Sequence, residues 1–197
     1  MMTKLLDSSL VATVVGVVLG FLLGFVPTLL RKREDRNELR KALFRELMSA
    51  YEQINYVAPA VKDGQESGIT VATGLVAVIG DALNTRVYEA SIDRLGKLNE
   101  AEIDCIMDAY LAIYQFKRYS DSLRQKCDGR SRPDESHRAE ITRLEDTAYR
   151  TSQIAFRSCR RALEAISPHD LERLEPKLNA NRGKWIEQVR VEPRTDS

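Results

Sequence analysis

One stretch of this chain constrains its fold more than any other, because no residue from Ser8 to Leu30 carries a charge. At 1.5 Å per helical residue the stretch covers about 34 Å, enough to cross the hydrocarbon core of a bilayer. A cleaved signal peptide is the competing interpretation, but its apolar core is shorter and ends in a small-residue cleavage site. The stretch 8–30 is therefore predicted to be an uncleaved transmembrane helix, preceded by a short extracytoplasmic N-terminus at 1–7.

Basic residues beside the apolar run indicate its orientation. Only Lys4 is basic before the run. The basic residues that follow it closely, and that we expect at the membrane surface, are Arg31, Lys32, Arg33 and Arg36. Because the side richer in Lys and Arg stays in the cytoplasm, we expect the N-terminus outside the inner (plasma) membrane and the C-terminal domain in the cytoplasm. Residues 31–41 are then a basic juxtamembrane segment that begins the first long helix and lies at the lipid bilayer.

Three glycines are spaced four residues apart inside the apolar run, at Gly16, Gly20 and Gly24. This spacing places them on one face of a helix, where a second backbone can approach closely. The pattern predicts that the chain forms a homo-oligomer through transmembrane packing. The alternative is that glycine is simply common in membrane helices.

Apolar residues recur at helical spacing through the rest of the chain. We expect helices over 34–62, 81–94, 99–127 and 134–166. Short loops between long helices favour antiparallel neighbours. The predicted fold class is all-α: an N-terminal transmembrane helix followed by a cytoplasmic antiparallel helical bundle over 34–190, with a disordered tail at 191–197.

Local signals predict where some of these helices begin and end. Asn99 can cap a helix, with Glu102 as its reciprocal partner in a capping box. Ser167 followed by Pro168 indicates the start of another helix, which we expect to be short because Pro176 stops it.

The sequence also predicts which residues of two apolar segments are buried. Residues 69–80 are uncharged but too short to span a bilayer, so we expect them to be buried within the domain rather than on the membrane surface. The apolar side of the helix at 99–127 is expected to consist of Ile103, Ile106, Met107, Tyr110, Ile113 and Tyr114.

The helix at 134–166 has a heptad seam made mostly of small residues. Its central members are Ala148, Thr151, Ala155, Ser158 and Ala162. Small side chains permit close contact between helices, so this seam is a candidate packing surface.

Residues that could support catalysis are scattered. His137 and His169 lie in different segments, and neither has a second ligand at metal-binding spacing. Three cysteines lie far apart, fit neither a disulfide framework nor a zinc site, and are typical of a reducing compartment. The 30 basic and 29 acidic residues nearly balance, which argues against a nucleic-acid partner. We therefore predict no enzyme activity, no cofactor and no metal.

Two further features leave alternatives open. A basic group on the last long helix could face anionic lipid or could be an ordinary solvated face near Asp146 and Glu164. Its members are Arg150, Arg157, Arg160 and Arg161. Trp185 could dock a partner protein or fold back on the bundle.

In one part of the chain, a short helix with a Tyr and a Gly turn leads through a Leu to an acidic helix with a Tyr midway. The residues of this pattern are Tyr88, Gly96, Leu98, Ile103 and Tyr110. The pattern resembles that of uncharacterised bacterial single-pass membrane-anchored helical proteins. The resemblance covers about a quarter of the chain and implies a bacterial or phage-related origin, but no activity.

Three functions remain to be separated. The leading hypothesis is a membrane-anchored interaction or scaffold protein that self-associates and recruits an unknown protein partner at the inner membrane face. The alternative is a membrane-perturbing oligomeric effector, such as a toxin, lysis or phage-defence component. Against it, one span without polar residues makes a poor water-filled pore. The third is an enzyme or ligand sensor whose site forms only in three dimensions.

Overall fold

The computed structural model describes residues 2–56, 76, 78–127 and 135–191, apart from the side chains of 2–12, 18, 22–26, 127, 135–137 and 182–191. The elements within these ranges are helices, which confirms the predicted all-α class. The chain divides into two compact units, Met1–Arg40 and Lys41–Ser197. The helix α1 (Met2–Asn55) contributes residues to both units.

The first unit contains the N-terminal part of α1, which continues as a helix through Pro27. Its described apolar side chains between Val14 and Leu30 are exposed, and Val17 and Phe21 are 68% and 64% exposed, whereas Leu39 is buried. Within the described residues, no helix has a stretch both long and apolar enough to cross a membrane. A helix at 8–30 agrees with the prediction, whereas its membrane crossing stays a prediction.

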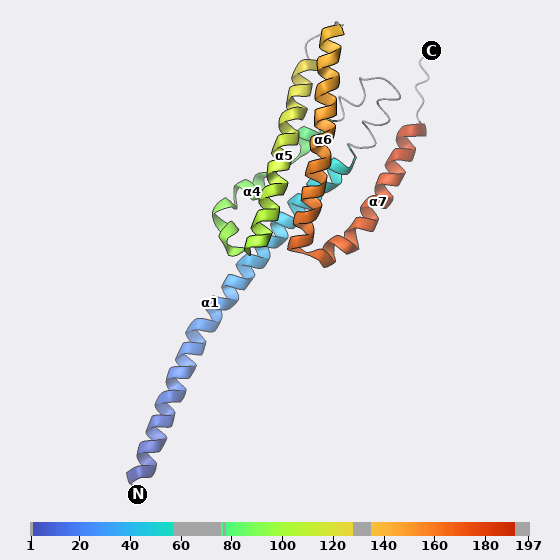
Figure 1. Ribbon diagram of the computed structural model, residues 1–197. Coiled ribbons are helices and arrows are strands. Elements are labelled where there is room, and N and C mark those ends of the chain that lie inside the picture. Colours follow the sequence, from blue (N-terminus) through green and yellow to red (C-terminus); the bar gives the residue numbers. More distant parts are fainter. Residues whose placement is uncertain (1, 57–75, 77, 128–134, 192–197) are drawn as a thin grey trace. The chain divides into compact units, whose positions relative to one another are not determined.

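The second unit is a helical bundle, as predicted. Its most extensive helix–helix contact is between α5 (Glu100–Cys127) and α6 (Glu135–Ile166), which lie side by side and antiparallel in Figure 1. The remaining bundle helices are the Lys41–Asn55 part of α1 and α7 (Pro168–Val191), which contacts α6. Fully buried core side chains include Leu43, Leu47, Ile54, Ile106, Ile113, Phe116 and Leu163.

The predicted start and end signals hold for the central helices. Asn99 Oδ1 accepts from the Glu102 backbone N–H at 2.8 Å, and Glu102 Oε2 accepts from the Asn99 N–H at 3.0 Å. This capping box satisfies two N–H groups at the start of α5. Pro168 is the first residue of α7, and Ser167 precedes it as expected.

The prediction of one continuous helix over 81–94 is wrong. Residues 83–85 are not helical; they are followed by the short helix α4 (Arg86–Glu89) and the 3₁₀ helix η1 (Ile92–Lys97). The break has a local cause, because Asn84 Oδ1 accepts from the Arg86 N–H at 3.1 Å. Asn side chains that bond nearby backbone in this way compete with helix formation.

Pro176 does not end the last helix, so that prediction is also wrong. α7 includes Pro176 and continues to Val191, and Figure 1 shows it changing direction along its length. A proline inside a helix removes one hydrogen bond and usually bends the helix. The preceding residue, Glu175, accepts hydrogen bonds from Tyr51 and Arg160, which tie this turn to its neighbours.

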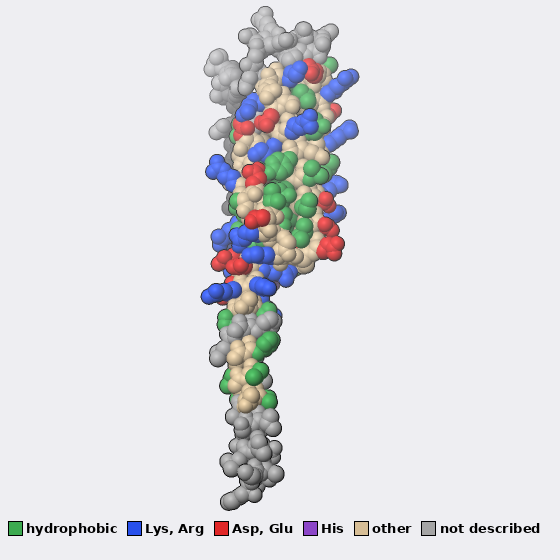
Figure 2. Space-filling model, turned by 90° about the vertical axis from the view of Figure 1, so that its left-hand side faces the viewer, with side chains coloured by type: hydrophobic (Ala, Val, Ile, Leu, Met, Phe, Trp, Pro, Cys, Tyr) green, Lys and Arg blue, Asp and Glu red, His purple; other side chains and the backbone are tan. Residues whose placement is uncertain are grey.

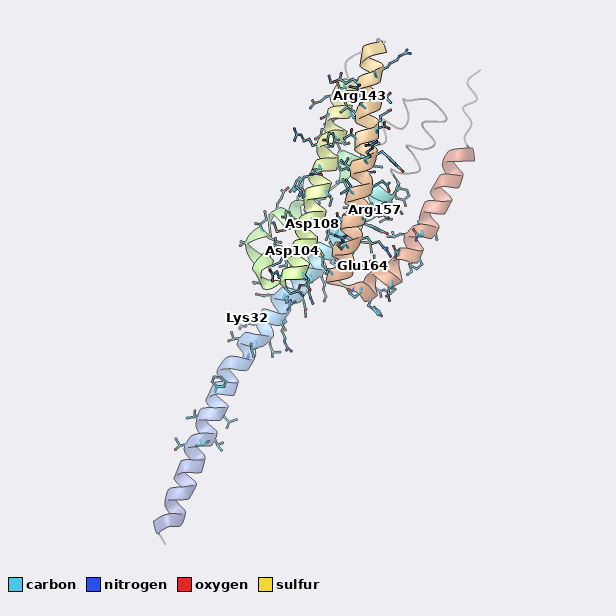
Figure 3. The ribbon with its side chains drawn as sticks, in the orientation of Figure 1. Lys32, Asp104, Asp108, Arg143, Arg157 and Glu164 are labelled. Carbon is cyan, nitrogen blue, oxygen red and sulfur yellow. The ribbon has the colours of Figure 1, made fainter. Side chains whose placement is uncertain are left out.

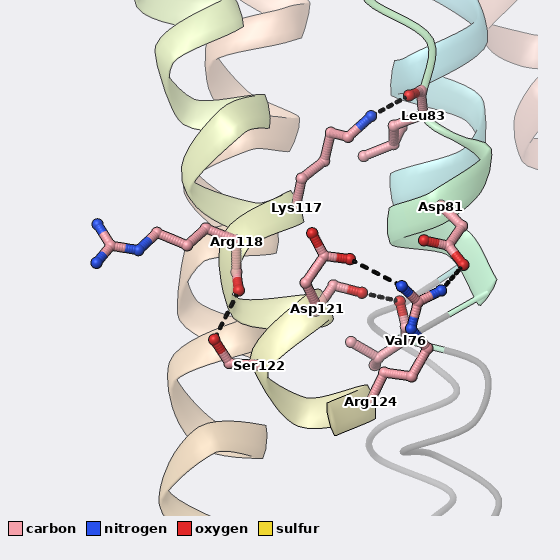
Figure 4. A network of polar contacts seen from close by, with 9 residues as sticks. Val76, Asp81, Leu83, Lys117, Arg118, Asp121, Ser122 and Arg124 are labelled. Carbon is pink, nitrogen blue, oxygen red and sulfur yellow. Dashed lines mark hydrogen bonds and ion pairs between the residues drawn. The ribbon is translucent and has the colours of Figure 1, made fainter. Parts of the chain in front are cut away.

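The segment before α4 packs closely against α5 (Figure 4). Ser120 Oγ donates to the Val76 carbonyl at 2.7 Å, and Lys117 Nζ donates to the Leu83 carbonyl at 2.7 Å. A Cβ at Gly80 would lie 2.1 Å from Ser120 Oγ, so this approach requires glycine. Val76 and Ile79 are buried, as expected for 69–80, but Val78 is 64% exposed, and 69–75 and 77 lie outside the described residues.

Candidate interaction site

A buried carboxylate joins three helices at the centre of the second unit. Glu46, on α1, accepts from the backbone N–H of Val87 at 2.8 Å and of Tyr88 at 3.0 Å. It also accepts from the Tyr110 hydroxyl of α5 at 2.5 Å. Thr85, which precedes α4, makes no capping bond, so Glu46 satisfies helix-start N–H groups that a neighbouring side chain would normally satisfy. Glu46, Tyr88 and Tyr110 together are called the Glu46 cluster.

The chemistry of the Glu46 cluster is that of a closed structural site. The rings of Tyr88 and Tyr110 are stacked with centroids 4.0 Å apart. Burial raises the pKa of Tyr110 strongly, and its hydrogen bond to Glu46 and the charge of Glu46 add to this rise. Tyr110 therefore stays protonated and donates to Glu46, and this bond joins α5 to α1.

A second polar contact joins α1, α6 and α7. The Tyr51 ring stacks on Phe156 with centroids 4.5 Å apart, and its hydroxyl donates to Glu175 Oε1 at 2.9 Å. Arg160 Nε donates to the same oxygen at 3.0 Å. The bond to Glu175 raises the pKa of Arg160, so its charge is held in this contact. Of the basic group predicted on α6, Arg160 thus has a defined structural partner.

The small-residue seam of α6 is used inside the unit. Ala148, Ala155 and Ala162 are fully buried, Thr151 is buried and Ser158 is half-buried. Thr151 Oγ1 also donates to the Ala148 carbonyl at 3.0 Å. Because α6 makes its largest contact with α5, the close approach that the seam permits serves the bundle itself.

The predicted membrane residues lie in the first unit. A Cβ at Gly16 or Gly20 would meet no atom within 4 Å, and the side of Gly24 lies outside the described residues. Arg31, Lys32 and Arg33 are exposed, and Arg36 is half-buried. These positions leave Gly16, Gly20 and the exposed residues 31–33 accessible, and their contacts with a second helix or with lipid stay predictions.

α5 exposes apolar side chains that sequence reasoning placed on its covered side. Ile106, Tyr110 and Ile113 are buried as expected, but Met107 and Tyr114 are 50% and 38% exposed. Leu111 is 59% exposed as well. Figure 2 shows hydrophobic side chains gathered on one face of the molecule. Contiguous exposed apolar side chains of this kind often mark a binding surface.

α6 carries a row of exposed arginines. Arg143, Arg150 and Arg157 recur every seven residues, so they share one face, and Arg161 follows one turn later. Figure 2 shows Lys and Arg side chains projecting along one edge of the molecule, and Figure 3 marks Arg143 and Arg157. The choice between a lipid-facing and a solvated row stays open.

The structure describes only some of the candidate metal and docking residues. Across the described part of the chain, no group of three or more His, Cys, Asp or Glu side chains could hold a metal ion. His169 is exposed near the start of α7. The side chains of His137 and Trp185 lie outside the described residues.

Glu46 is the principal residue that sequence reasoning missed. One signal could have indicated it, because Glu46 lies three residues after Leu43 and one before Leu47, both on the apolar face of the helix. A carboxylate inside an apolar stripe requires hydrogen-bond donors when it is buried. Which donors those are depends on other helices and cannot be deduced from α1 alone.

Comparison with protein-family models, curated protein sequences and solved structures gives no match. The resemblance at Tyr88, Gly96, Leu98, Ile103 and Tyr110 therefore stays a prediction. The fold and its surfaces define an all-α helical-bundle protein with an exposed apolar stripe on α5.

Proposed function

We propose that this protein is a single-pass membrane-anchored scaffold that self-associates and recruits a protein partner at the inner membrane face. The observation that carries the proposal is the uncharged run from Ser8 to Leu30 followed at once by basic residues. Hydrocarbon accommodates such a run, and the anionic inner leaflet attracts the basic residues after it.

Exposure in the first unit supports this assignment. Val14, Val17 and Phe21 are each more than half exposed. Burying such side chains is favourable by about 1.5–3 kcal/mol each, so a lipid environment would stabilise the segment substantially. Arg31–Arg33 are exposed directly after it and can reach lipid headgroups.

Features of the second unit support a role in interaction rather than catalysis. The buried carboxylate of Glu46 is fully engaged by three donors. The exposed features are an apolar stripe on α5 and an arginine row on α6, which are groups that bind other macromolecules.

The test is the membrane topology of the full chain. Thr3→Cys and Gln125→Cys are made separately in a chain with Cys105 and Cys127 replaced by Ser. The remaining Cys159 is buried, so it is the internal control that should stay unlabelled in the folded chain. An impermeant maleimide is expected to label Thr3→Cys in intact cells, but Gln125→Cys only after permeabilisation. The chain is expected to stay in membranes after a carbonate wash.

Two outcomes would contradict the proposal. Recovery of the chain in the carbonate supernatant, or labelling of Gln125→Cys in intact cells, would remove the proposed anchor or its orientation. Membrane potential is followed in the same cells. Depolarisation on expression would favour the membrane-perturbing effector over the scaffold.

A further inference from the structure

The exposed apolar residues of α5 follow the spacing of a helix–helix seam. Met107, Leu111 and Tyr114 are separated by steps of four and three, which keeps them on one face. Single exposed apolar residues are common, but three consecutive members of one face form a contiguous surface. The opposite face of the same helix is already covered by the bundle.

Charged residues extend this face at both ends. Asp104 lies three residues before Met107, and Arg118 lies four residues after Tyr114. Both are exposed, and neither makes an ion pair in the described part of the chain. Figure 3 marks Asp104 on α5, and Figure 4 shows the Arg118 side chain pointing away from the network around Arg124. The face composed of Asp104, Met107, Leu111, Tyr114 and Arg118 is called the α5 stripe.

The aromatic member of the stripe is held in place. The Tyr114 hydroxyl donates to Glu89 Oε1 at 2.6 Å, and Thr85 Oγ1 donates to the same carboxylate at 2.8 Å. The bond from Tyr114 lowers the pKa of Glu89, which keeps this acceptor ionised. An aromatic ring fixed before binding loses less conformational freedom on association.

We infer that the α5 stripe pairs two copies of this chain, with their α5 helices antiparallel and crossing near Leu111. The 3-4 spacing of the stripe is the spacing of a coiled-coil seam. In the antiparallel arrangement, Asp104 of each copy lies beside Arg118 of the other, so the two ends attract. In a parallel arrangement like charges would face each other, which disfavours it. A two-fold axis makes the surface self-complementary, as a homodimer requires.

This inference rests on the self-association in the proposed function and names a surface for it outside the membrane segment. It does not depend on the anchor. Its test therefore uses the full chain in detergent with Gly16, Gly20 and Gly24 replaced by Leu, which removes the proposed transmembrane packing. If the topology experiment fails, the dimer mass measured by sedimentation is unaffected. If the dimer is absent, the measured membrane topology is unaffected.

The first experiment is a charge swap read by sedimentation. In the glycine-replaced chain, Asp104→Arg and Arg118→Asp are each expected to weaken the dimer by about tenfold, because two attractive contacts become repulsive. The double variant is expected to restore the dimer. Residues 104 and 118 are about 21 Å apart along one helix at 1.5 Å per residue, so recovery cannot come from pairing within a chain.

Controls separate the swap from a general charge effect. Glu172→Arg makes the same change at an exposed position on α7 and is expected to leave the dimer unchanged. Circular dichroism confirms that each surface variant is folded. A monomeric parent chain, an unchanged mass in Asp104→Arg, or a double variant that does not recover would each overturn the inference.

A second experiment reads the orientation directly. Copies with Asp104→Cys are mixed with copies with Arg118→Cys, in a chain where Cys105 and Cys127 are Ser. The mixture is expected to form a disulfide-linked dimer under mild oxidation, whereas Asp104→Cys alone is not. Crosslinking of Asp104→Cys with itself and not with Arg118→Cys would show a parallel pair and overturn the antiparallel arrangement.

Discussion

The two units of this protein treat apolar side chains in opposite ways. In Met1–Arg40 the described apolar residues of α1 between Val14 and Leu30 are exposed, and Val17 is 68% exposed, whereas Leu39 near the end of this unit is buried. In Lys41–Ser197 a core of the same kinds of residue is buried, and Leu43 and Ile113 are fully covered, although the α5 face with Met107 and Leu111 is exposed. The difference is not one of secondary structure, because one helix, α1, contributes to both.

This contrast shows that a buried apolar core lies in the second unit, whereas residues 14–30 of the first unit have no such core among the described residues. The bundle buries its apolar face against its own helices, and Glu46 obtains its hydrogen bonds there. The first unit offers exposed apolar surface whose burial would be favourable. Matched substitutions in the two units therefore test the contrast directly.

The largest difference is expected when the same charge enters each unit. Ile113→Lys should lower the free energy of unfolding of the bundle by about 5 kcal/mol, because it removes a buried side chain and leaves a buried charge unpaired. Val17→Lys should leave bundle unfolding unchanged but weaken membrane insertion by about 3 kcal/mol. Thermal unfolding followed by circular dichroism measures the first effect, and carbonate extraction the second.

The contrast would fail if Val17→Lys lowered the unfolding temperature of the bundle as much as Ile113→Lys does. Val17→Leu is the control for the first unit, since it preserves apolar character. That variant should remain in the carbonate-washed membranes to the same extent as the native chain.

A smaller difference is expected when a methyl group is added to a glycine in each unit. Gly80→Ala should cost about 1–3 kcal/mol, because the new Cβ would lie 2.1 Å from Ser120 Oγ. Gly20→Ala should cause no loss, because nothing lies within 4 Å of its Cβ position and alanine favours the helix. Urea unfolding of the full chain in detergent measures both variants.

Ser120→Gly provides the control for that clash. Ser120→Gly removes the hydroxyl and Cβ that the Gly80→Ala methyl would meet, at the cost of the bond to Val76. The double variant should lose less stability than the sum of the two single variants. Additive losses would show that the contact between Gly80 and Ser120 does not limit this packing.

The smallest effect expected is a loss of bundle stability at alkaline pH. Burial raises the pKa of Cys159 to about 12 from its ordinary value of 9.0. The folded state therefore keeps a proton that the unfolded state releases above pH 9, so stability is full below that pH and falls as pH rises toward 12. The loss is about 1.4 kcal/mol per pH unit within this window.

Urea unfolding at pH 8 and pH 10 measures this dependence. Between pH 8 and pH 10, Cys159→Ala should lose about 1.4 kcal/mol less free energy of unfolding than the native chain, because it lacks the titrating thiol. Identical pH dependence in the two chains would exclude the thiol as the cause. The half-buried Cys105 should react with a thiol reagent in the native chain, whereas Cys159 should react only after unfolding.

Signals contained within a few residues predicted the fold well. The capping box of Asn99 and Glu102 lies within one helical turn, and Ser167 with Pro168 determines the start of α7 through backbone geometry alone. The ends predicted for α5 and α6 agree with the structure to within one residue. Helix class and bundle architecture could therefore be predicted.

Features that depend on contacts between distant residues could not be predicted. Pro176 lies inside α7, where the neighbouring Glu175 is bound by Tyr51, more than a hundred residues earlier. Met107 and Tyr114 are as apolar as their buried neighbours, and only the position of the other helices decides which are covered. The candidate site shares this limit, since the Glu46 cluster brings together α1, α4 and α5.

The hydrogen bonds of Glu46 have a consequence for the order in which the bundle opens. α4 has four residues and buries none of them, and the amides of its second and third residues, Val87 and Tyr88, depend on a side chain from α1. Those amides are protected from deuterium exchange only while α1 and α4 are docked together. Hydrogen exchange at the backbone amides of Val87 and Tyr88 therefore reports local opening of the bundle. These amides exchange once their hydrogen bonds to Glu46 break, before α5 and α6 separate.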